Sequence, residues 1–580
     1  MHQNEYDALV IGSGFGGSVV ACRLAEAGMR VCVLERGRAF PPGSFPRTQR
    51  GLSRNVWDPS RGTHGMFNVW SFSGIEALVA AGLGGGSLIY ANVLLRKPAA
   101  WFAEDHDGRR PWPVSRDDLD PHYDRVEARM NVQRYPFEHR PYSGTRKTAA
   151  LKEAAGRLGL DWERPPLAVT FGEAVGEDFE PVSPVPGVPI PERRPNLHAV
   201  LEGRPHARTT CRLCGECDVG CNYGSKNTLD FTYLTDAHYA GAEIRTLCEA
   251  QEIEPVEGGG YRVHFARHDP DGPYWKTAGR ELESVTADRL VLSAGTLGST
   301  FLLLKNRKRL GPISPRLGER FCGNGDLLSF AMKCGDGEGA DRQPRDLGPT
   351  YGPVITSTVS VPDRLDGAGD GRGFYIQDAG FPAFVTWILE AASFGTLKRA
   401  ARAGARFVRR RLRRDPDADI GSEITDLLGA CALSEGSVPL LGMGRDIPDG
   451  RFTLTRGPRG EPHLACDWTM ETSRPFFGRV RDAMEAITRA WGGTFVPNPT
   501  FRMSRVVTVH PLGGCSMGRG ADDGVVNEHG EVFGNPGLYV ADGAVMPGPV
   551  GPNPALTIAA LADRTADYIL RKPDARPFNP

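Results

Sequence analysis

The sequence predicts an α/β protein in which a Rossmann-like domain, a parallel sheet with helices, is joined to a second, α+β domain. The first observation behind this prediction is the stretch from residue 7 to residue 35, which has the pattern of strand, glycine turn, helix and strand. The second is the length of 580 residues, which exceeds what one hydrophobic core usually serves. Together they predict at least two domains, one of which binds a dinucleotide.

The glycine turn predicts where the dinucleotide binds. Gly12, Gly14 and Gly17 follow the G-x-G-x-x-G spacing. Gly12 allows the tight turn, Gly14 lets backbone N–H groups approach a pyrophosphate, and Gly17 lets the helix pack closely on the strand. Glu35 ends the second strand, where an acidic side chain accepts hydrogen bonds from a ribose. A purely structural glycine turn is the alternative, but the register of all these features favours a dinucleotide site.

A second glycine-rich stretch, residues 81 to 92, leads into an apolar run. Its candidate cofactor contacts are Gly84, Gly86, Ser87 and Asn92. A flexible linker is the alternative interpretation, but linkers of that kind are not normally followed by Leu-Ile-Tyr. We therefore expect this loop to contact the cofactor.

Composition and charge narrow the class of protein. The formal net charge is −1, which gives no electrostatic reason to expect nucleic acid as a partner. The N-terminus has no basic segment followed by an apolar core, and no run of ~18 apolar residues exists, so we expect neither a signal peptide nor a spanning helix. The protein is accordingly expected in the cytoplasm, with its thiols reduced.

Four cysteines form a second candidate site. Cys211, Cys214, Cys217 and Cys221 have the C-x2-C-x2-C-x3-C spacing of bacterial ferredoxins. Thiolates this close together can hold a metal ion or an Fe–S cluster, and disulfides are less expected in a reducing compartment. In ferredoxins the fourth cysteine serves another cluster, and this chain has no second cysteine group. A cluster and a cysteine-rich turn that binds nothing therefore both remain open.

Residues 384 to 414 predict a basic amphipathic helix. Apolar residues recur at spacings of three and four, and most of the lysines and arginines lie off that face. Such a helix can contact an anionic membrane peripherally, or it can be a solvated helix packed on the domain by its apolar stripe. We favour the solvated helix and keep a peripheral membrane association as the alternative.

The last 80 residues carry the candidate chemistry. His510 follows an apolar strand and precedes a glycine turn, and Asp542 and Gly543 end another strand. Asn553 lies between two prolines at the entry to a helix, where a rigid capped turn is the simpler explanation. Ligands of an open α/β sheet bind at the carboxyl ends of its strands, so we predict a site role for His510.

At these residues the chain resembles the glucose–methanol–choline (GMC) flavoprotein oxidoreductases. The motifs concerned are the turn at Gly12, the loop from Gly82 to Asn92, Ser293 to Thr296, His510 to Gly514 and Gly551 to Pro554. The His510 and Asn553 motifs are most similar to those of bacterial cholesterol oxidases that bind FAD non-covalently. The match is specific in the FAD-binding parts of the chain and thin in the substrate domain.

The resemblance implies a division of the chain. An FAD-binding domain would comprise residues 1–100, 205–310 and 500–580. A substrate-binding domain with a mostly antiparallel sheet would comprise residues 101–204 and 311–499.

The resemblance also implies residue roles. Glu35 would bind the FAD ribose, Asp542 and Gly543 would lie near the ribityl chain and pyrophosphate, and His510 and Asn553 would face the flavin. Cholesterol oxidases use a glutamate for steroid isomerisation, and the corresponding stretch here offers Asp378. Some GMC dehydrogenases carry an Fe–S cluster, which the four-cysteine loop resembles.

Three functions are therefore compared. The first is oxidation of a sterol or steroid 3-hydroxyl to a ketone, with hydride transfer to flavin N5, O2 or another acceptor taking the electrons, and isomerisation following. The second is a dehydrogenase for another lipophilic alcohol that passes electrons through a cluster. The third is a membrane-associated binding protein that keeps the flavin fold without turnover.

Overall fold

A computed structural model describes most of the chain. The described residues are 5–103, 112–272, 281–337, 342–363, 372–383, 435–457, 460–498, 500–501 and 504–572. The predicted basic helix over 384–414 lies outside them.

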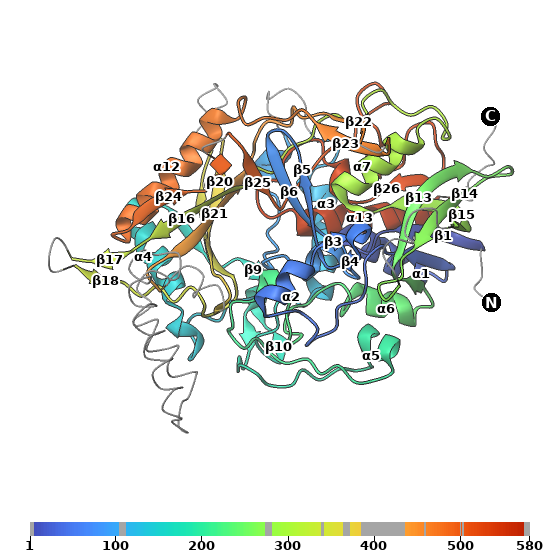
Figure 1. Cartoon of the computed structure of the whole chain (residues 1–580). Coiled ribbons are helices and arrows are strands. Elements are labelled where there is room, and N and C mark those ends of the chain that lie inside the picture. The colour runs from blue at the N-terminus through green and yellow to red at the C-terminus, as the bar shows by residue number, and fades with distance from the viewer. Residues whose placement is uncertain are drawn as a thin grey trace, which may run out of the picture.

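The core of one lobe is a mostly parallel sheet, on the right in Figure 1. Its strand order is β12-β2-β1-β15-β14-β13, and β26 pairs with the carboxyl half of β15. Strands β12, β2, β1, β15 and β26 are parallel, whereas β13 and β14 add an antiparallel hairpin at the edge. Their bounds are β1 Glu5–Ile11, β2 Val31–Leu34, β12 Glu243–Arg245, β13 Cys248–Pro255, β14 Tyr261–Arg267, β15 Glu283–Leu292 and β26 Leu538–Val540. The predicted Rossmann-like parallel sheet with helices is confirmed.

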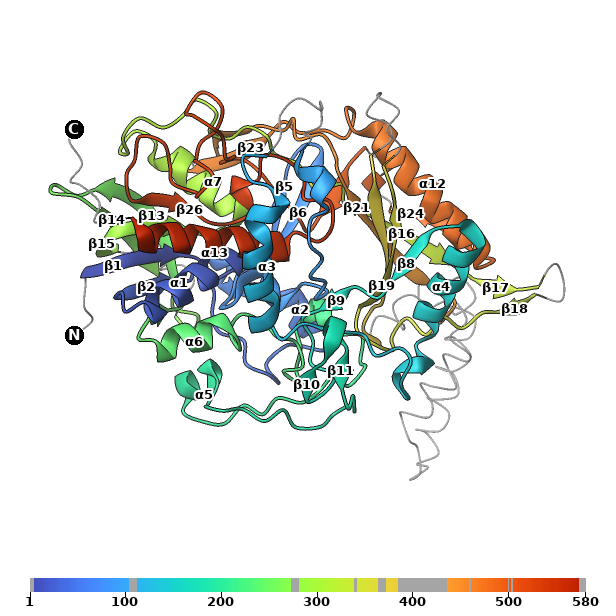
Figure 2. The same ribbon diagram turned by 180° about the vertical axis from the view of Figure 1, so that it is seen from behind.

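Helices cover this sheet because each presents small or apolar residues to it. Helix α1 begins at the glycine turn and ends before Gly28, whose φ of +86° suits a C-terminal stop. The long helix α13 packs along α1, and α3 crosses α13 (Figure 2). The helices of this lobe are α1 Phe15–Glu26, α3 Arg116–Arg129, α6 Tyr233–Tyr239, α7 Gly295–Asn306 and α13 Ala555–Arg571.

The second lobe is built on an antiparallel sheet, as the sequence predicts for the second domain. Its order is β24-β16-β21-β20-β19-β8, and every pairing is antiparallel. Helices α12 and α4 pack on the sheet and on each other. The bounds are β8 Asp161–Glu163, β16 Leu327–Met332, β19 Ile355–Val361, β20 Phe374–Ala379, β21 Val438–Gly444, β24 Thr494–Pro497, α4 Arg146–Leu158 and α12 Arg474–Ala490.

A small three-stranded sheet lies between the two lobes in both views (Figures 1 and 2). Strand β6 (Ile75–Ala80) pairs antiparallel with β5 (Phe67–Ser71) and parallel with β25 (Val506–Thr508). Because β25 ends two residues before His510, this sheet sets the position of that side chain.

The remaining elements are short connections. They are α2 Gln49–Arg54, β3 Trp57–Asp58, β4 Thr63–His64, β7 Gln133–Arg134, β9 Pro166–Leu167, β10 Ala174–Val175, β11 Pro181–Val182, α5 Leu197–Glu202, β17 Gly335–Asp336, β18 Gln343–Pro344, β22 Phe452–Arg456 and β23 Pro462–Cys466.

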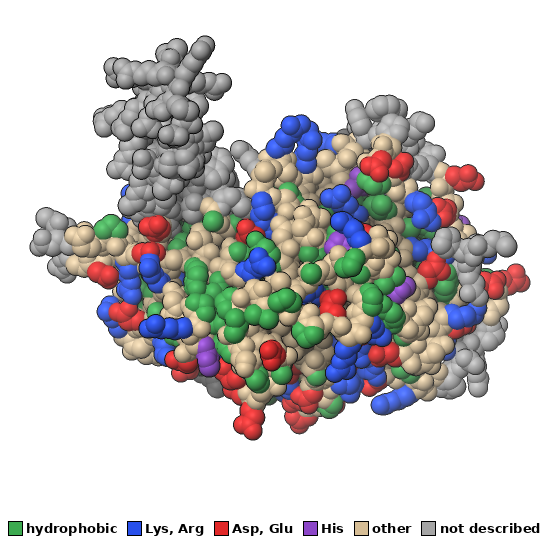
Figure 3. Space-filling view, turned by 90° about the horizontal axis from the view of Figure 1, so that it is seen from below, with side chains coloured by type: hydrophobic (Ala, Val, Ile, Leu, Met, Phe, Trp, Pro, Cys, Tyr) green, Lys and Arg blue, Asp and Glu red, His purple; other side chains and the backbone are tan. Residues whose placement is uncertain are grey.

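The charged side chains of the described residues show no large region of a single sign on the face viewed from below (Figure 3). Lysine and arginine are interspersed with aspartate and glutamate on the face in Figure 3, among scattered apolar side chains. Within the described residues, no helix is long and apolar enough to cross a membrane. The cysteines of the described residues are all free thiols.

A buried ion-pair cluster joins three helices of the first lobe. The Asp563 carboxylate on α13 pairs with Arg23 on α1, with Arg125 on α3, and with His122 Nδ1 at 2.7 Å. Its side chain is only 2% exposed. These hydrogen bonds and positive charges outweigh the opposing effect of burial and lower the pKa of Asp563 to about 2.

We expect Asp563→Asn to lower the free energy of unfolding by about 2–3 kcal/mol at neutral pH, because the folded pKa lies nearly two units below the usual value. A depressed carboxyl pKa stabilises the fold above the unfolded pKa, so the loss should shrink as the pH falls through 3.8 towards 2. Chemical denaturation of both proteins at several pH values measures it. Asp567→Asn, which removes a more exposed carboxylate that pairs with the same two arginines, should cost less; an equal cost would contradict the role of burial.

Candidate active site

One cavity of about 880 Å³ runs from the glycine turn after β1 to the antiparallel sheet. It brings together eight of the residues predicted from the sequence, namely Gly12, Gly14, Glu35, Gly86, His510, Asp542, Gly543 and Asn553. The other predicted cofactor and catalytic residues lie behind its walls, namely Gly17, Gly84, Ser87, Asn92 and Asp378.

The glycine turn is shaped by close backbone packing on three sides. A Cβ at Gly12 would lie 2.2 Å from the carbonyl oxygen of Ser293, and a Cβ at Gly17 would lie 2.0 Å from that of Gly12. Gly16 is as constrained, because its Cβ would fall 1.4 Å from the carbonyl oxygen of Ala541. Gly14 differs, since a Cβ there meets nothing within 4 Å and its φ of −74° suits any residue. The free space at Gly14 is therefore on the cavity side, where a ligand's phosphates would approach.

Glu35 lies at the carboxyl end of β2 with its carboxylate buried in the cavity wall. It accepts hydrogen bonds from Ser13 Oγ at 2.6 Å and from the backbone N–H groups of Ser13 and Gly37. Burial raises the pKa of Glu35, and these donors oppose that rise. Both Ser13 donors use Oε2, whereas Oε1 accepts only the Gly37 N–H and keeps a second lone pair, so the side chain can still accept a hydroxyl donor from a ribose.

Asp542 is placed at the carboxyl end of β26, beside the amino end of α7. Its carboxylate accepts hydrogen bonds from Ser299 Oγ at 2.5 Å and from the Ala544 backbone N–H at 2.8 Å. Burial raises the pKa of Asp542 to about 6. Asp542 and Gly543 thus share one cavity wall with the first turn of α7.

The second glycine loop contacts the first through its backbone. A Cβ at Gly85 would lie 2.7 Å from the Gly14 Cα atom. Ser87 shapes the loop, because its hydroxyl donates to the Gly84 carbonyl and accepts from the Leu229 N–H. Asn92 is fully buried with a φ of 72°. Gly85 and Gly86 are therefore the cavity-lining glycines of this loop, whereas Gly84, Ser87 and Asn92 lie behind the wall.

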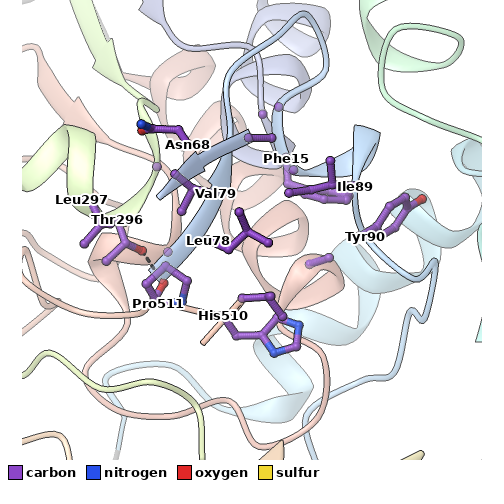
Figure 4. Close-up of a pocket in the computed structure, with 18 of the residues that line it drawn as sticks. Phe15, Asn68, Leu78, Val79, Ile89, Tyr90, Thr296, Leu297, His510 and Pro511 are labelled. Carbon is purple, nitrogen blue, oxygen red and sulfur yellow. Dashed lines mark hydrogen bonds between the residues drawn. The ribbon is translucent and has the colours of Figure 1, made fainter. Parts of the chain in front are cut away.

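His510 is held by a carboxylate that the sequence did not indicate. Its Nδ1 lies 2.8 Å from Oδ1 of Asp326, whose side chain is 1% exposed. If Nδ1 carries the hydrogen, it donates to Asp326 and leaves the Nε2 lone pair as an acceptor. Figure 4 shows His510 next to Pro511, whose carbonyl accepts from the Thr296 hydroxyl at 2.6 Å. The imidazole is thus oriented as a proton acceptor.

Asn553 is oriented by a second residue that the sequence did not indicate. Gln377 Nε2 on β20 donates to Asn553 Oδ1 at 2.8 Å. With its oxygen engaged, Asn553 has its NH2 group available to the cavity that it lines. His510 and Asn553 therefore offer one acceptor and one donor to a hydroxyl group.

Asp378 lies on the other face of β20 from Gln377, because neighbouring strand residues point in opposite directions. Its carboxylate is fully buried and accepts from Lys147 Nζ at 3.2 Å, from the Thr356 hydroxyl at 2.6 Å, and from the Thr356 and Ser357 backbone N–H groups. This network occupies the carboxylate away from the cavity, so the position does not favour the isomerisation role predicted for Asp378.

The end of the cavity beyond His510 and Asn553 is largely apolar. The strands of the second lobe contribute side chains on facing positions, since Leu328 pairs with Leu441 and Phe330 with Pro439. The other apolar residues here are Val354, Ile355, Ala379, Phe381 and Val509. Such a wall fits a lipophilic substrate whose single polar group reaches the His510–Asn553 pair.

The four cysteines surround a second, much smaller cavity of about 20 Å³. Asp218 and Val219, which lie between the last two cysteines, also line the main cavity. Lys226, fully buried beneath the loop, donates to the backbone carbonyls of Cys217, Leu88 and Tyr90. The cysteine loop is therefore a part of the main cavity's supporting wall.

Comparison with known proteins defines the class. Family models of the GMC oxidoreductases match residues 201–320 and 448–562, and a model of NAD(P)-binding Rossmann-like domains matches residues 10–67. The protein belongs to the GMC oxidoreductase family and is an oxidoreductase that acts on CH–OH donors. The family resemblance expected from the motifs is thus confirmed.

Individual relatives carry several names. A cholesterol oxidase of Mycobacterium tuberculosis is 31% identical over 97% of this chain and 90% of its own length. A cholesterol oxidase of Acinetobacter baumannii is 26% identical (98% and 95%), and a 2-methyl-1,2-propanediol dehydrogenase of Mycolicibacterium austroafricanum is 23% identical (98% and 96%). The crystal structure of pyridoxine 4-oxidase from Mesorbium loti shares the fold, with a TM-score of 0.56 and 16% identity over 98% of this chain and 99% of that one.

We expect Gly14→Ala to fold like the parent but to bind the dinucleotide roughly tenfold or more weakly, because only the ligand side of Gly14 is affected. Flavin absorbance retained after gel filtration, together with the melting temperature of the ligand-free protein, measures both effects. Gly17→Ala is the matched control and should give little soluble protein, since its Cβ would meet backbone. A Gly14→Ala protein that retains flavin like the parent would contradict this placement of the phosphates.

Proposed function

We propose that this GMC oxidoreductase uses FAD to oxidise the 3-hydroxyl of a sterol or steroid to a ketone. The single observation that carries the proposal is the His510–Asn553 pair, which offers an acceptor and a donor where the dinucleotide end of the cavity meets its apolar end. The relative at 31% identity is named for cholesterol, which supports a sterol substrate. A relative named for a short diol makes the identity of the alcohol a question for experiment.

The residues present fit FAD. Gly12, Gly14 and Gly86 would lie against the pyrophosphate, Glu35 would accept the ribose hydroxyls, and Asp542 with Gly543 would lie along the ribityl chain. The free space at Gly14 and the buried carboxylate at the end of β2 support this assignment. We further propose 1–100, 205–310 and 500–580 as the FAD-binding domain, with 101–204 and 311–499 as the substrate-binding domain.

FAD, when bound, supplies the acceptor for a hydride. The chain supplies the proton acceptor and the hold on the oxygen. The substrate O–H donates to His510 Nε2, and Asn553 donates an N–H to the same oxygen. As the C–H bond breaks, His510 takes the hydroxyl proton, and Asp326 stabilises the imidazolium that results. Asn553 holds the oxygen through the change from alcohol to ketone without adding charge.

The proposed product is the unisomerised ketone. Moving a double bond into conjugation needs a base that carries a proton between two carbons of the steroid. Asp378 is occupied by Lys147 and Thr356 and does not line the cavity, and the residue of β20 that contacts Asn553 is the neutral Gln377.

Anaerobic addition of cholesterol to the purified protein tests the substrate and the mechanism together. We expect the flavin bands to bleach, and the product to retain its original double bond. His510→Ala should bleach about 10²-fold or more slowly while it keeps its flavin. If the flavin bands stay unchanged with cholesterol but bleach with another lipophilic alcohol, the proposed sterol substrate is wrong. If His510→Ala reduces its flavin at a near-parental rate, His510 is not the proton acceptor.

The four-cysteine loop supports a second candidate, a lipophilic-alcohol dehydrogenase that passes electrons to an Fe–S cluster instead of to O2. All four cysteines line one small cavity, and two neighbouring buried polar atoms, Ser225 Oγ and Asp218 Oδ1, have no hydrogen-bond partner. In the described part of the chain, no three cysteine sulfurs come as close together as a single ion requires. A cluster separates its ligands further than one ion does, so the spacing of the sulfurs argues against a single zinc ion at this loop.

Iron and acid-labile sulfide in protein purified without oxygen decide this candidate. We expect about stoichiometric iron together with a broad absorbance beneath the flavin bands, and we expect Cys217→Ser to lose both while flavin remains. Cys334→Ser, a buried thiol away from the loop, is the matched control. Iron-free protein that passes electrons from an alcohol to O2 at full rate would exclude the cluster-dependent dehydrogenase and support the oxidase.

Peripheral membrane contact through 384–414 remains a separate proposal, tested by vesicle flotation.

A further inference from the structure

We infer that one four-residue loop, Gly323 to Asp326, is a positioning element that fixes both His510 and Asn553, with Asp326 and Asn324 as its two positioning residues. The loop leads into β16 and thus belongs to the second lobe, whereas His510 and Asn553 both follow in the last 80 residues. The inference rests on the proposed roles of His510 and Asn553 and assigns the residues that make those roles possible.

Asp326 uses both carboxylate oxygens on the segment that carries His510. Oδ1 lies 2.8 Å from His510 Nδ1, and Oδ2 accepts from the Thr508 hydroxyl at 2.9 Å and from the Val509 N–H at 2.8 Å. The ring is therefore held through its own nitrogen and through the backbone before it. The carboxylate favours hydrogen on Nδ1, and its negative charge stabilises the protonated ring after proton transfer.

Asn324 holds the turn that carries Asn553. Its Nδ2 donates to the carbonyls of Pro552 at 3.0 Å and Gly551 at 3.3 Å, and its Oδ1 accepts from the Gly551 N–H at 2.9 Å. The Asn324 side chain is fully buried and its φ is 54°, a conformation that asparagine tolerates better than most residues. The turn is thus held by three hydrogen bonds from one amide.

The Gly323–Asp326 loop is itself held in place by Asp446 and by close packing around Gly325. Asp446 accepts from the backbone N–H groups of Gly323 and Gly325, both at 2.9 Å. Gly325 has a φ of +65°, and a Cβ there would lie 2.7 Å from the Phe476 ring and 2.9 Å from the Gly444 nitrogen. The Thr508 hydroxyl lies 3.0 Å from the Gly323 carbonyl oxygen and 2.9 Å from Asp326 Oδ2, so its one hydrogen is shared between two acceptors of this loop. The loop therefore has little room to shift relative to either catalytic segment.

The consequence for the reaction is a fixed spacing between acceptor and donor. A substrate hydroxyl must meet His510 Nε2 and the Asn553 amide together, and small errors in such geometry reduce rate steeply. Because both groups are anchored to the same four-residue loop, through Asn324 and Asp326, their separation does not depend on the bulk of the substrate. Loss of the Asp326 charge should therefore affect kcat more than KM.

Asp326→Asn tests the inference in the flavin-loaded enzyme. We expect flavin content and KM to stay near parental values while kcat falls roughly 10²–10³-fold. Glu531→Gln is the matched control, since it removes another buried carboxylate outside the His510 segment; it should alter stability without lowering kcat. An Asp326→Asn enzyme with the parental kcat overturns the inference.

Nitrogen NMR of protein labelled at its 13 histidines gives a readout that needs no turnover. The His510 signal, identified by its absence from His510→Gln, should show hydrogen on Nδ1 in the parent and lose that preference in Asp326→Asn. A tautomer unaffected by Asp326→Asn would overturn the positioning role even if alcohol oxidation is found. If Asp326→Asn shifts the tautomer but the parent protein oxidises no alcohol, the proposed function is wrong while the positioning of His510 by Asp326 stands.

Asn324→Asp provides the second arm, because it keeps the side chain's shape and the acceptor to Gly551 but loses the two donated hydrogen bonds. We expect kcat to fall at least tenfold, while the His510 hydrogen stays on Nδ1 because Asp326 remains its partner. Parental kcat in soluble, flavin-loaded Asn324→Asp would limit the positioning role to Asp326 alone.

Discussion

The dinucleotide end of this molecule depends on backbone segments that cross without side chains between them. At the carboxyl ends of β1, β15 and β26, Gly12 lies against the Ser293 carbonyl and Gly16 against that of Ala541. These close approaches bring residues from three distant parts of the sequence to one edge of the parallel sheet. The cavity that reaches from Glu35 to His510 begins at this crossing.

Much of that end is predictable because its signals are local. The spacing of Gly12, Gly14 and Gly17 and the position of Glu35 follow from a strand–turn–helix–strand unit of some thirty residues. The spacing alone could not tell which glycine of the motif faces the ligand and which packs against the protein backbone. Gly14 faces the cavity and Gly17 packs on backbone, although both are glycines of one fingerprint. The requirement at Gly16 comes from Ala541, a contact that only the tertiary fold creates.

The end of the cavity with His510 and Asn553 was less predictable, because the contacts that orient these side chains join residues far apart in the sequence. His510 stands out at a strand end, but Asp326 directly before β16 and Gln377 within β20 carry no signal of their own until the fold brings them next to His510 and Asn553. The glycines on both sides of Asn324 were the available signal for Asp326. Neighbouring strand residues point to opposite faces, so the pattern of β20 alone does not tell whether Gln377 or Asp378 faces Asn553.

The apolar wall comes from strands of the second lobe, while the groups proposed to perform the chemistry come from the last 80 residues and are held by the loop before β16 and by Gln377 of β20. Side chains such as Leu328 and Leu441 can thus change in size without disturbing the hydrogen bonds that orient His510. A lineage with this architecture can acquire a new substrate through a few wall substitutions and keep its reaction intact. Relatives named for cholesterol and for a short diol are what such an evolutionary separation of specificity from chemistry would produce.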